Sequence, residues 1–230
     1  MLGTDEWQIV ALSLKVSGVA VALTLPVAFA LAWVLARTRF VGKVVLDAVV
    51  HLPLVLPPVV TGWLLLIAFG NNGAIGRWMG ETLGISVMFR WTGAALAAAV
   101  MALPLMVRAM RISIEAVDRR LEDAARTLGA TPLRTFWTVT VPLASPGLLA
   151  AAVLGLARSL GEFGATITFV SNIPGETRTI PLAIYGALQT PGGEAVVTRL
   201  SVVAVLLSLV ALVTSELLAR RAGRGGGHVL

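Results

Sequence analysis

Long apolar stretches separated by short charged segments dominate the hydrophobic pattern of the chain. Five uncharged stretches are each close to the length that crosses a hydrocarbon core of about 30 Å, which requires about 20 helical residues. They cover residues 16–36, 52–76, 91–107, 135–157 and 200–215. We therefore expect an all-α integral membrane protein, a polytopic bundle with five transmembrane helices at about 12–36, 48–70, 91–110, 143–163 and 196–219.

Two weaker apolar stretches, 163–175 and 179–193, are shorter and interrupted by turn-forming residues. The interruptions are Pro174, Gly175, Pro181, Gly186 and Pro191. Irregular backbone at membrane depth is stable only where protein or water shields it, because lipid offers no hydrogen-bond partners. We interpret these stretches as an ordered outer loop or as a segment that re-enters the membrane, and six spans are the alternative to five.

Composition argues against a soluble domain. Hydrophobic residues make up 57% of the 230 residues, charged residues make up only 13%, and the mean hydropathy is +0.89. Ordinary globular domains contain about 25% charged residues. Five spans leave no room for a separate soluble catalytic domain. We therefore expect one transmembrane domain at 1–220 and a disordered Gly-rich tail at 221–230.

Candidate catalytic and metal-binding chemistry is sparse. The chain has no cysteine and only two histidines, His51 and His228, which excludes a thiolate metal site and disfavours a histidine one. No phosphate-binding loop of the form G-x-x-x-x-G-K-S/T occurs, so the chain cannot cradle the phosphates of ATP. The predicted helices contain no clustered acid pair and no Ser-His arrangement, which argues against a membrane enzyme or intramembrane protease. We expect no enzyme activity, cofactor or metal in this chain, and interpret His51 as an interfacial residue.

The distribution of Lys and Arg predicts the orientation of the chain in the membrane. Short loops that carry positive charge stay on the cytoplasmic side. Twelve of the 18 Lys and Arg share one side, namely Arg37, Arg39, Lys43, Arg108, Arg111, Arg119, Arg120, Arg126, Arg134, Arg220, Arg221 and Arg224. We expect the N-terminus outside and the C-terminus in the cytoplasm. Since the cations are scattered between apolar runs, the net charge of +6 reflects orientation and does not indicate nucleic-acid binding.

The segment 112–134, between the third and fourth predicted helices, is more charged than the rest of the chain. Its apolar residues recur at spacings of three and four, which predicts one stripe on a short helix. They are Ile114, Val117, Leu121, Ala124 or Ala125, and Leu128. Gly129 ends this helix, and Thr131 followed by Pro132 is typical of the start of another. The two cytoplasmic helices, at about 114–136, are either a surface connector or a docking element for a soluble partner.

The same loop carries a motif with fixed spacing. Asp123-Ala124-Ala125 is followed by Gly129 and then by Val139, Val141 and Pro142. This resembles the EAA motif of ABC importer permeases: E-A-A, three residues, G, nine residues, I-x-L-P. Asp replaces Glu here, although Glu122 precedes it, and valines replace Ile and Leu. In that family the segment is a coupling helix seated in a groove of the ATP-binding subunit. The resemblance implies coupling contacts by Glu122, Asp123, Ala124, Ala125, Gly129 and Pro142.

Three further stretches, 51–66, 124–130 and 159–194, resemble the permeases of molybdate ABC importers. With the N-terminal segment, the resemblance runs from about residue 4 to 220. It implies the MetI-like permease fold and transport of molybdate, with tungstate accepted because its size and charge are nearly the same. Sulfate and thiosulfate permeases have a similar coupling motif, so a permease for another oxyanion is the alternative. A non-transporting membrane scaffold is a more remote one.

The resemblance also implies the partners of the chain. They are a second copy of the chain, two copies of a cytoplasmic ABC ATPase and a periplasmic molybdate-binding protein. ATP and Mg would be held by the ATPase, in line with the missing phosphate loop in this chain. The expected location is the cell inner membrane, crossed several times.

Four residues within the apolar stretches are candidates for the transport pathway or its gate. Arg158 and Glu162 are four apart on one predicted helix, so they lie on one face and can pair. Charged groups inside a membrane usually face a bundle interior or an aqueous cavity, although a structural salt bridge explains this pair equally well. Pro57 and Pro58 predict a kink in the second helix, either a pore hinge or a simple packing kink.

The segment 171–179 is rich in turn formers and hydrogen-bonding side chains. It is either an unspecialised outer loop or the face that receives the binding protein. For the second reading, Glu176 and Arg178 are the candidate ion-pair contacts.

The charge bias yields a topological prediction. A tag inserted after Arg221 should be reached by protease only from the cytoplasmic side of sealed vesicles, and a tag before Asp5 only from outside. Cleavage of both tags from the same side would contradict five spans and support six.

Overall fold

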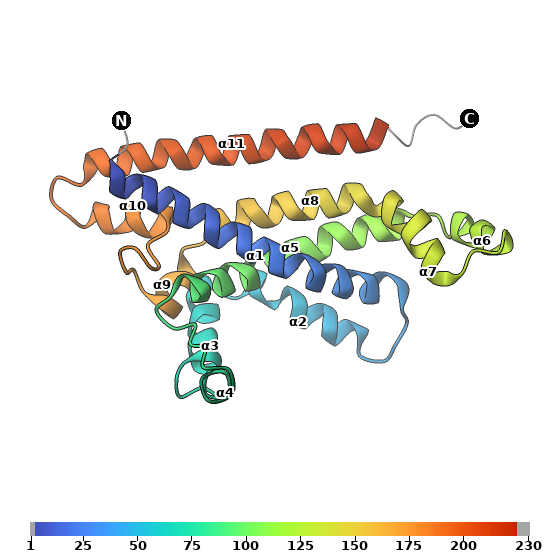
Figure 1. Ribbon diagram of the computed structural model, residues 1–230, viewed down its shortest axis with the longest axis horizontal. Helices are drawn as coiled ribbons and strands as arrows, with labels where there is room; N and C mark the ends of the chain where they lie inside the picture. Colours follow the sequence, from blue (N-terminus) through green and yellow to red (C-terminus); the bar gives the residue numbers. More distant parts are fainter. Residues whose placement is uncertain (1–2, 225–230) are drawn as a thin grey trace.

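The computed structural model describes residues 3–224, and every regular element in that range is a helix. The elements are α1 (Thr4–Arg37), α2 (Lys43–Val55), α3 (Pro58–Phe69), α4 (Ala74–Leu83), α5 (Trp91–Ala116), α6 (Arg119–Thr127), α7 (Pro132–Thr135), η1 (Phe136–Thr140), α8 (Val141–Leu160), α9 (Gly164–Val170), α10 (Ile180–Leu188) and α11 (Glu194–Arg224) (Figure 1). The short η1 is a π-helix that joins α7 to α8. The predicted all-α class is confirmed.

Four helical segments are long and apolar enough to cross a membrane: Thr4–Arg37, Trp91–Ala116, Pro132–Leu160 and Glu194–Thr214. The second expected span instead forms a bent pair, α2 and α3, with a bend of 115°. Pro57 is the N-cap of α3, and the preceding Leu56 is extended. Proline lacks an amide hydrogen and disfavours a helical residue before it, so α2 ends there. Counted as one span, the pair completes the five that the sequence predicts.

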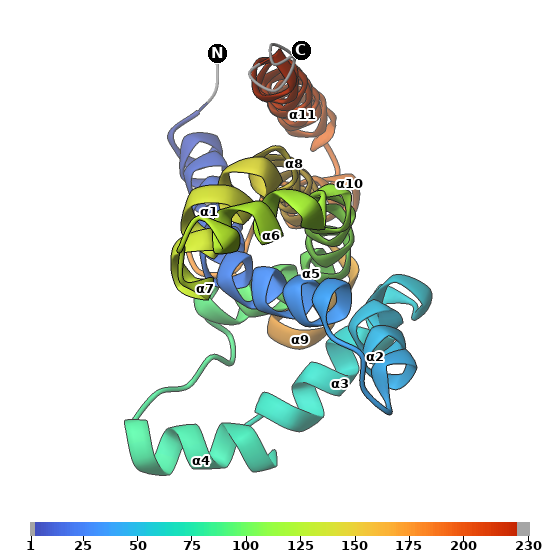
Figure 2. The same ribbon diagram turned by 90° about the vertical axis from the view of Figure 1, so that its right-hand side faces the viewer.

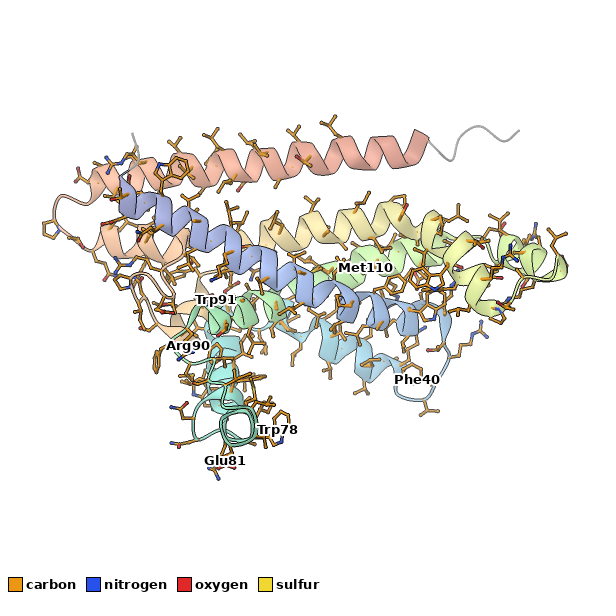
Figure 3. The ribbon with its side chains drawn as sticks, viewed as in Figure 1. Phe40, Trp78, Glu81, Arg90, Trp91 and Met110 are labelled. Atoms are coloured by element: carbon orange, nitrogen blue, oxygen red, sulfur yellow. The ribbon has the colours of Figure 1, made fainter. Side chains whose placement is uncertain are left out.

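The core of the bundle is formed by α1, α5 and α8, which run side by side along the long axis (Figure 1). The buried face of α5 is built from small residues, among them Ala94, Ala97, Ala98 and Ala102. Gly147 on α8 approaches α5 so closely that a Cβ there would lie 2.1 Å from Cβ of Ser113. Met110 of α5 is fully buried inside the bundle (Figure 3). Such close contact holds helices together in lipid, where burial from water supplies no force between them.

The last two helices are anchored to α1 by polar contacts. Arg199 at the start of α11 binds the buried Glu6 carboxylate, with NH2 to Oε1 at 2.7 Å and Nε to Oε1 at 2.9 Å. The hydroxyl of Ser13 accepts the Ile180 N–H of α10 at 2.8 Å and donates to the Ile9 carbonyl at 2.9 Å. Beyond this anchor, most of the apolar side chains of α11 that the structure describes are exposed, as suits a helix that faces lipid.

Two parts of the chain extend beyond the core. Helices α3 and α4 form an arm that projects sideways from the bundle, at the end of the bundle where the chain begins. The arm carries Trp78 and Glu81 away from the core (Figures 2 and 3). Helices α6 and α7 form the opposite end of the molecule (Figure 1). The two weaker apolar stretches fold into the short helices α9 and α10, joined by the irregular segment 171–179.

The single apolar stripe predicted over 114–128 is wrong. Helix α5 continues to Ala116, so Ile114 belongs to this long helix and is fully buried in the core. Val117 caps α5, and the Asp118 carboxylate accepts the Arg120 N–H at 2.9 Å to begin α6. The spacing spans two helices because the core captures Ile114 and Val117, and Leu121 is left exposed.

The C-terminal end also differs from the expected disordered tail at 221–230. Helix α11 extends to Arg224, and residues 225–230 lie outside the described residues.

Candidate functional site: the loop between α5 and α8 and the broken helices

The turn between α6 and α7 has the predicted geometry. Helix α6 ends at Thr127, and Gly129 adopts a φ of +87°, a conformation that costs glycine little and other residues more. Thr131 is the N-cap of α7, with its hydroxyl accepting the Arg134 N–H at 3.3 Å, and Pro132 follows at the first helical position. The predicted turn and helix start are confirmed.

The outward face of α6 is apolar in its centre and charged at its edges. Leu121 is 50% exposed, Leu128 is 89% exposed, and Ala124 between them is also exposed. Asp123 is exposed beside this strip, whereas Ala125 is half-buried. Exposed leucines beside a small alanine face form a surface that another protein can approach closely.

The two adjacent acids of the loop differ in their contacts and burial. The Glu122 side chain is only 12% exposed, and its Oε1 lies 2.8 Å from NH2 of Arg37, at the end of α1. The same oxygen accepts the hydroxyl hydrogen of Thr140, in η1, at 2.6 Å. Neighbours on a helix project about 100° apart, so the two acids differ in burial although both line one hollow beside α6. The structure therefore engages Glu122 within the chain and leaves Asp123 available on the surface.

An aromatic cluster surrounds this ion pair. The rings of Trp33 and Phe136 meet edge-on at 4.9 Å between centroids, and Phe29 contacts both rings. The Arg37 guanidinium lies 5.8 Å from the centroid of the Trp33 ring, within the range of a cation–π contact. Sequence reasoning missed Arg37, Thr140 and this cluster. The only sequence signal for these contacts was the presence of Trp33 in the last turn of the first predicted helix and of Arg37 directly after it.

Pro142, the last residue of the motif, is exposed in the first turn of α8, directly after the π-helix. A proline there cannot donate a backbone hydrogen bond to the preceding turn. The wider i→i+5 bonding of η1 occurs at this point, with the Val141 N–H bonded to the Phe136 carbonyl. A π-turn within a longer helix is often found at functional sites.

The kink predicted at Pro57 and Pro58 packs against the break between α8 and α9. A Cβ added to Gly164 would lie 2.6 Å from Cβ of Pro58, and one added to Gly62 would lie 2.6 Å from the Ala165 carbonyl oxygen. Pro57 and Pro58 are themselves exposed. The start of α3 and the start of α9 are thus in backbone contact through glycines.

Arg158 and Glu162 form the ion pair that their spacing predicts, at 2.6 Å between NH1 and Oε2. The Glu162 side chain is 2% exposed and the Arg158 side chain 25%. The other carboxylate oxygen, Oε1, accepts the Ala165 N–H at 2.9 Å. Glu162 therefore links the end of α8 to the first turn of α9, as a structural pairing requires, while Arg158 keeps a partly open side.

The segment 171–179 is a tightly bonded loop. The fully buried Thr177 hydroxyl donates to the Ser171 carbonyl and accepts the Ile173 N–H, both at 2.8 Å. Nε of Arg178 donates to Oδ1 of Asn172 at 3.0 Å, so this arginine is half-buried and engaged. Glu176 is exposed. Of the two residues predicted to contact a binding protein, the loop presents Glu176 more openly.

A second polar cluster, which the sequence did not predict, joins α2 to α5. NH1 of Arg111 lies 3.2 Å from both carboxylate oxygens of Asp47, and its Nε donates to Oε1 of Glu115 at 2.8 Å. Nδ1 of His51 lies 2.9 Å from the Asp47 carbonyl oxygen. Within residues 3–224, no three His, Asp or Glu side chains are arranged to hold a metal ion.

Comparison with known protein families gives a match over residues 2–224 to the family described as "Binding-protein-dependent transport system inner membrane component". The chain is 58% identical to the molybdenum transport system permease protein ModB of Escherichia coli (strain K12), over 97% of this chain and 100% of that protein. The ModB of Haemophilus influenzae is 54% identical, over 97% and 99%. The sulfate transport system permease protein CysW of Synechococcus elongatus is 37% identical, over 94% and 74%.

Solved structures of ABC transporters have the same fold. A chain of a bacterial alginate ABC transporter, in complex with a periplasmic protein that carries an alginate pentasaccharide, matches with a TM-score of 0.75 and 17% identity, covering 95% of this chain and 80% of that one. A chain of the MetNI methionine ABC transporter in an inward-facing conformation matches with a TM-score of 0.66 and 18% identity, covering 94% of each.

The Arg158–Glu162 geometry generates a stability prediction. The Arg158→Ala variant strands a buried carboxylate and is expected to destabilise the protein by about 3–5 kcal/mol. The double variant Arg158→Ala/Glu162→Ala should regain most of this loss, measured as the thermal melting midpoint in detergent.

Transport by the double variant separates the two readings of the pair. Recovered stability with recovered transport supports a structural role. Recovered stability with transport still abolished would contradict it and assign Arg158 to the pathway.

Proposed function

Because the chain belongs to the family of binding-protein-dependent transport system inner-membrane components, we propose that it is the permease subunit of an ATP-driven importer of molybdate. It is a multi-pass protein of the inner membrane and has no ATPase site of its own. The single observation that carries the proposal is 58% identity to a molybdenum permease over 97% of the chain.

Molybdate is favoured over sulfate by the same comparison. Identity to the two molybdenum permeases is 58% and 54%, whereas identity to the sulfate permease is 37%. Tungstate has nearly the size and charge of molybdate, so we expect it to be carried as well. A permease for sulfate, thiosulfate or another oxyanion is the second candidate, supported by the sulfate relative.

The proposed complex contains two copies of this chain, two copies of a cytoplasmic ATPase that holds ATP and Mg, and a periplasmic molybdate-binding protein. ATP binding draws the ATPase subunits together and opens the pathway toward the binding protein, and hydrolysis resets it. The exposed strip of Leu121, Ala124 and Leu128 supports α6 as the docking face, because it offers apolar surface without a partner in the chain. Asp123 at its edge is the acid proposed to meet a basic group of the ATPase.

We propose that the contact between α3 and α9 acts as the gate of the pathway. Both helices begin at a break, and Gly62 and Gly164 bring the two starts into contact. Discontinuous helices of this kind form substrate sites and gates in many transporters. Pro57 and Pro58 supply the hinge, and the Arg158–Glu162 pair fixes the position of α9. Glu176 and Arg178 are proposed to receive the binding protein on the outer side.

Reconstituted uptake tests the proposal directly. Proteoliposomes that contain the chain and its ATPase, with loaded binding protein on the outer side, should accumulate labelled molybdate only when ATP is enclosed. Excess unlabelled tungstate should compete strongly and sulfate weakly. Uptake of sulfate in preference to molybdate would support the second candidate, and uptake of neither would contradict the importer.

The loop itself yields a further prediction for Gly129. At a φ of +87°, a β-branched residue is strained by about 1–2 kcal/mol and would turn the Ala124 face away from its partner. The Gly129→Val variant should retain less ATPase on co-purification, or retain it without stimulated ATP turnover. The permease should still insert and assemble.

A substitution of a glycine with negative φ in a helix is the matched control. In the Gly18→Ala variant, the added Cβ meets no atom within 4 Å, so subunit retention and turnover should be normal. Normal retention and turnover in Gly129→Val as well would make the loop an ordinary connector.

A further inference from the structure

Neither covalent connection of α6 to the membrane helices is a continuous helix. On one side, α5 and α6 are separated by the non-helical residues Val117 and Asp118. On the other side lies the turn around Gly129, with its positive φ. Backbone dihedrals at such positions absorb displacement, as they do at hinges. Side-chain contacts outside these two connections give a displacement of α6 a second route to the membrane helices.

Glu122 provides a non-covalent route to two of those helices at once. A single oxygen, Oε1, binds Arg37 at 2.8 Å and Thr140 at 2.6 Å. Arg37 is in the last turn of α1, and Thr140 is the last residue of η1, which continues directly into α8. Because α1 and α8 both pack in the core with α5, a displacement of Glu122 acts on the core without passing through either turn.

The surroundings make this contact stronger than a surface ion pair. The side chains of Arg37 and Glu122 are 11% and 12% exposed, and Thr140 is 2% exposed. Water competes little at such burial, so the charge-assisted hydrogen bonds strengthen and breaking one leaves a stranded group. The Trp33 ring beside Arg37 packs on Phe136 of η1, which adds a rigid aromatic contact between the same two helices.

The contact also has room to change. A hollow of about 390 Å³ borders α6, and its lining includes Arg37, Glu122, Asp123 and Thr140. The hydroxyl of Thr135, which also lines this hollow, is buried without a hydrogen-bond partner. A π-turn next to this hollow can exchange i→i+5 for i→i+4 bonding, which shifts the register of the helix that follows.

We propose that Glu122 is a positioning residue of transport coupling, which transmits the displacement of α6 to α1 and α8 through Arg37 and Thr140. The proposal rests on the proposed function, in which a cytoplasmic ATPase docks on α6. It assigns different roles to two adjacent acids: Asp123 holds the ATPase, and Glu122 passes its motion on.

The test compares Glu122→Gln with Asp123→Asn in the full complex, reconstituted with ATPase and loaded binding protein. Glu122→Gln keeps the side-chain volume and leaves the outer face of α6 unchanged, so ATPase retention on co-purification should be normal. The transport ratio, defined as the number of molybdate ions carried per ATP hydrolysed, should fall about tenfold. This is the order expected when a charge-assisted hydrogen bond is lost. Asp123→Asn should instead lower ATPase retention, with the transport ratio of the retained complex much less affected.

Two further variants keep the test decisive if Glu122→Gln assembles poorly. Thr140→Val removes only the hydroxyl contact and should lower the transport ratio with retention intact. The charge exchange Arg37→Glu/Glu122→Arg should restore part of the ratio that Glu122→Gln loses, which a loss of folding alone does not predict.

The outcomes separate this proposal from the proposed function. If the wild-type complex carries molybdate and Glu122→Gln loses the ATPase as Asp123→Asn does, Glu122 is a partner contact and the positioning role is overturned. An unchanged transport ratio in both Glu122→Gln and Thr140→Val overturns it equally. If the wild-type complex itself carries no molybdate, the proposed function fails first.

Discussion

Close backbone contact among α1, α5 and α8 is the constraint on which the other elements depend. Lipid removes the hydrophobic force between helices, so small residues such as Ala98 and Gly147 hold them by bringing the backbones close together. This core leaves the remaining helices at its margins. Apolar packing attaches them, as with Phe169 of α9 and Leu200 of α11, and buried ion pairs add specific contacts.

Buried polar contacts supplement the apolar packing at the margins of this core. Glu6 holds α11 through Arg199, Glu162 holds α9 to the end of α8, and Glu122 holds α6 to α1 and η1. In a medium with little water, each carboxylate satisfies several donors at once, since an unpaired one would be costly.

Much of the fold was predictable because membrane spans are encoded locally. Stretches of about 20 uncharged apolar residues identify helices without reference to any partner. The turn at Gly129, the start of α7 at Thr131 and the Arg158–Glu162 pair were equally local, since backbone conformation and a spacing of four residues determine them. The EAA-like spacing identified the loop and suggested its docking role, which is a proposal. The family resemblance was recognisable from this spacing and from the stretches 51–66, 124–130 and 159–194.

The tertiary structure decided what local patterns cannot encode. Apolar spacing of three and four ran through 114–128 as if it were one helix, yet packing of Ile114 in the core ended that stripe at Val117. The sequence also offered Glu122 and Asp123 as an equivalent acidic pair. Contacts with Arg37, 85 residues away, and with Thr140 engage the first within the chain, whereas the second is exposed. A contact between residues so distant in the chain depends on how α1 packs beside α8, and nothing near Glu122 records that packing.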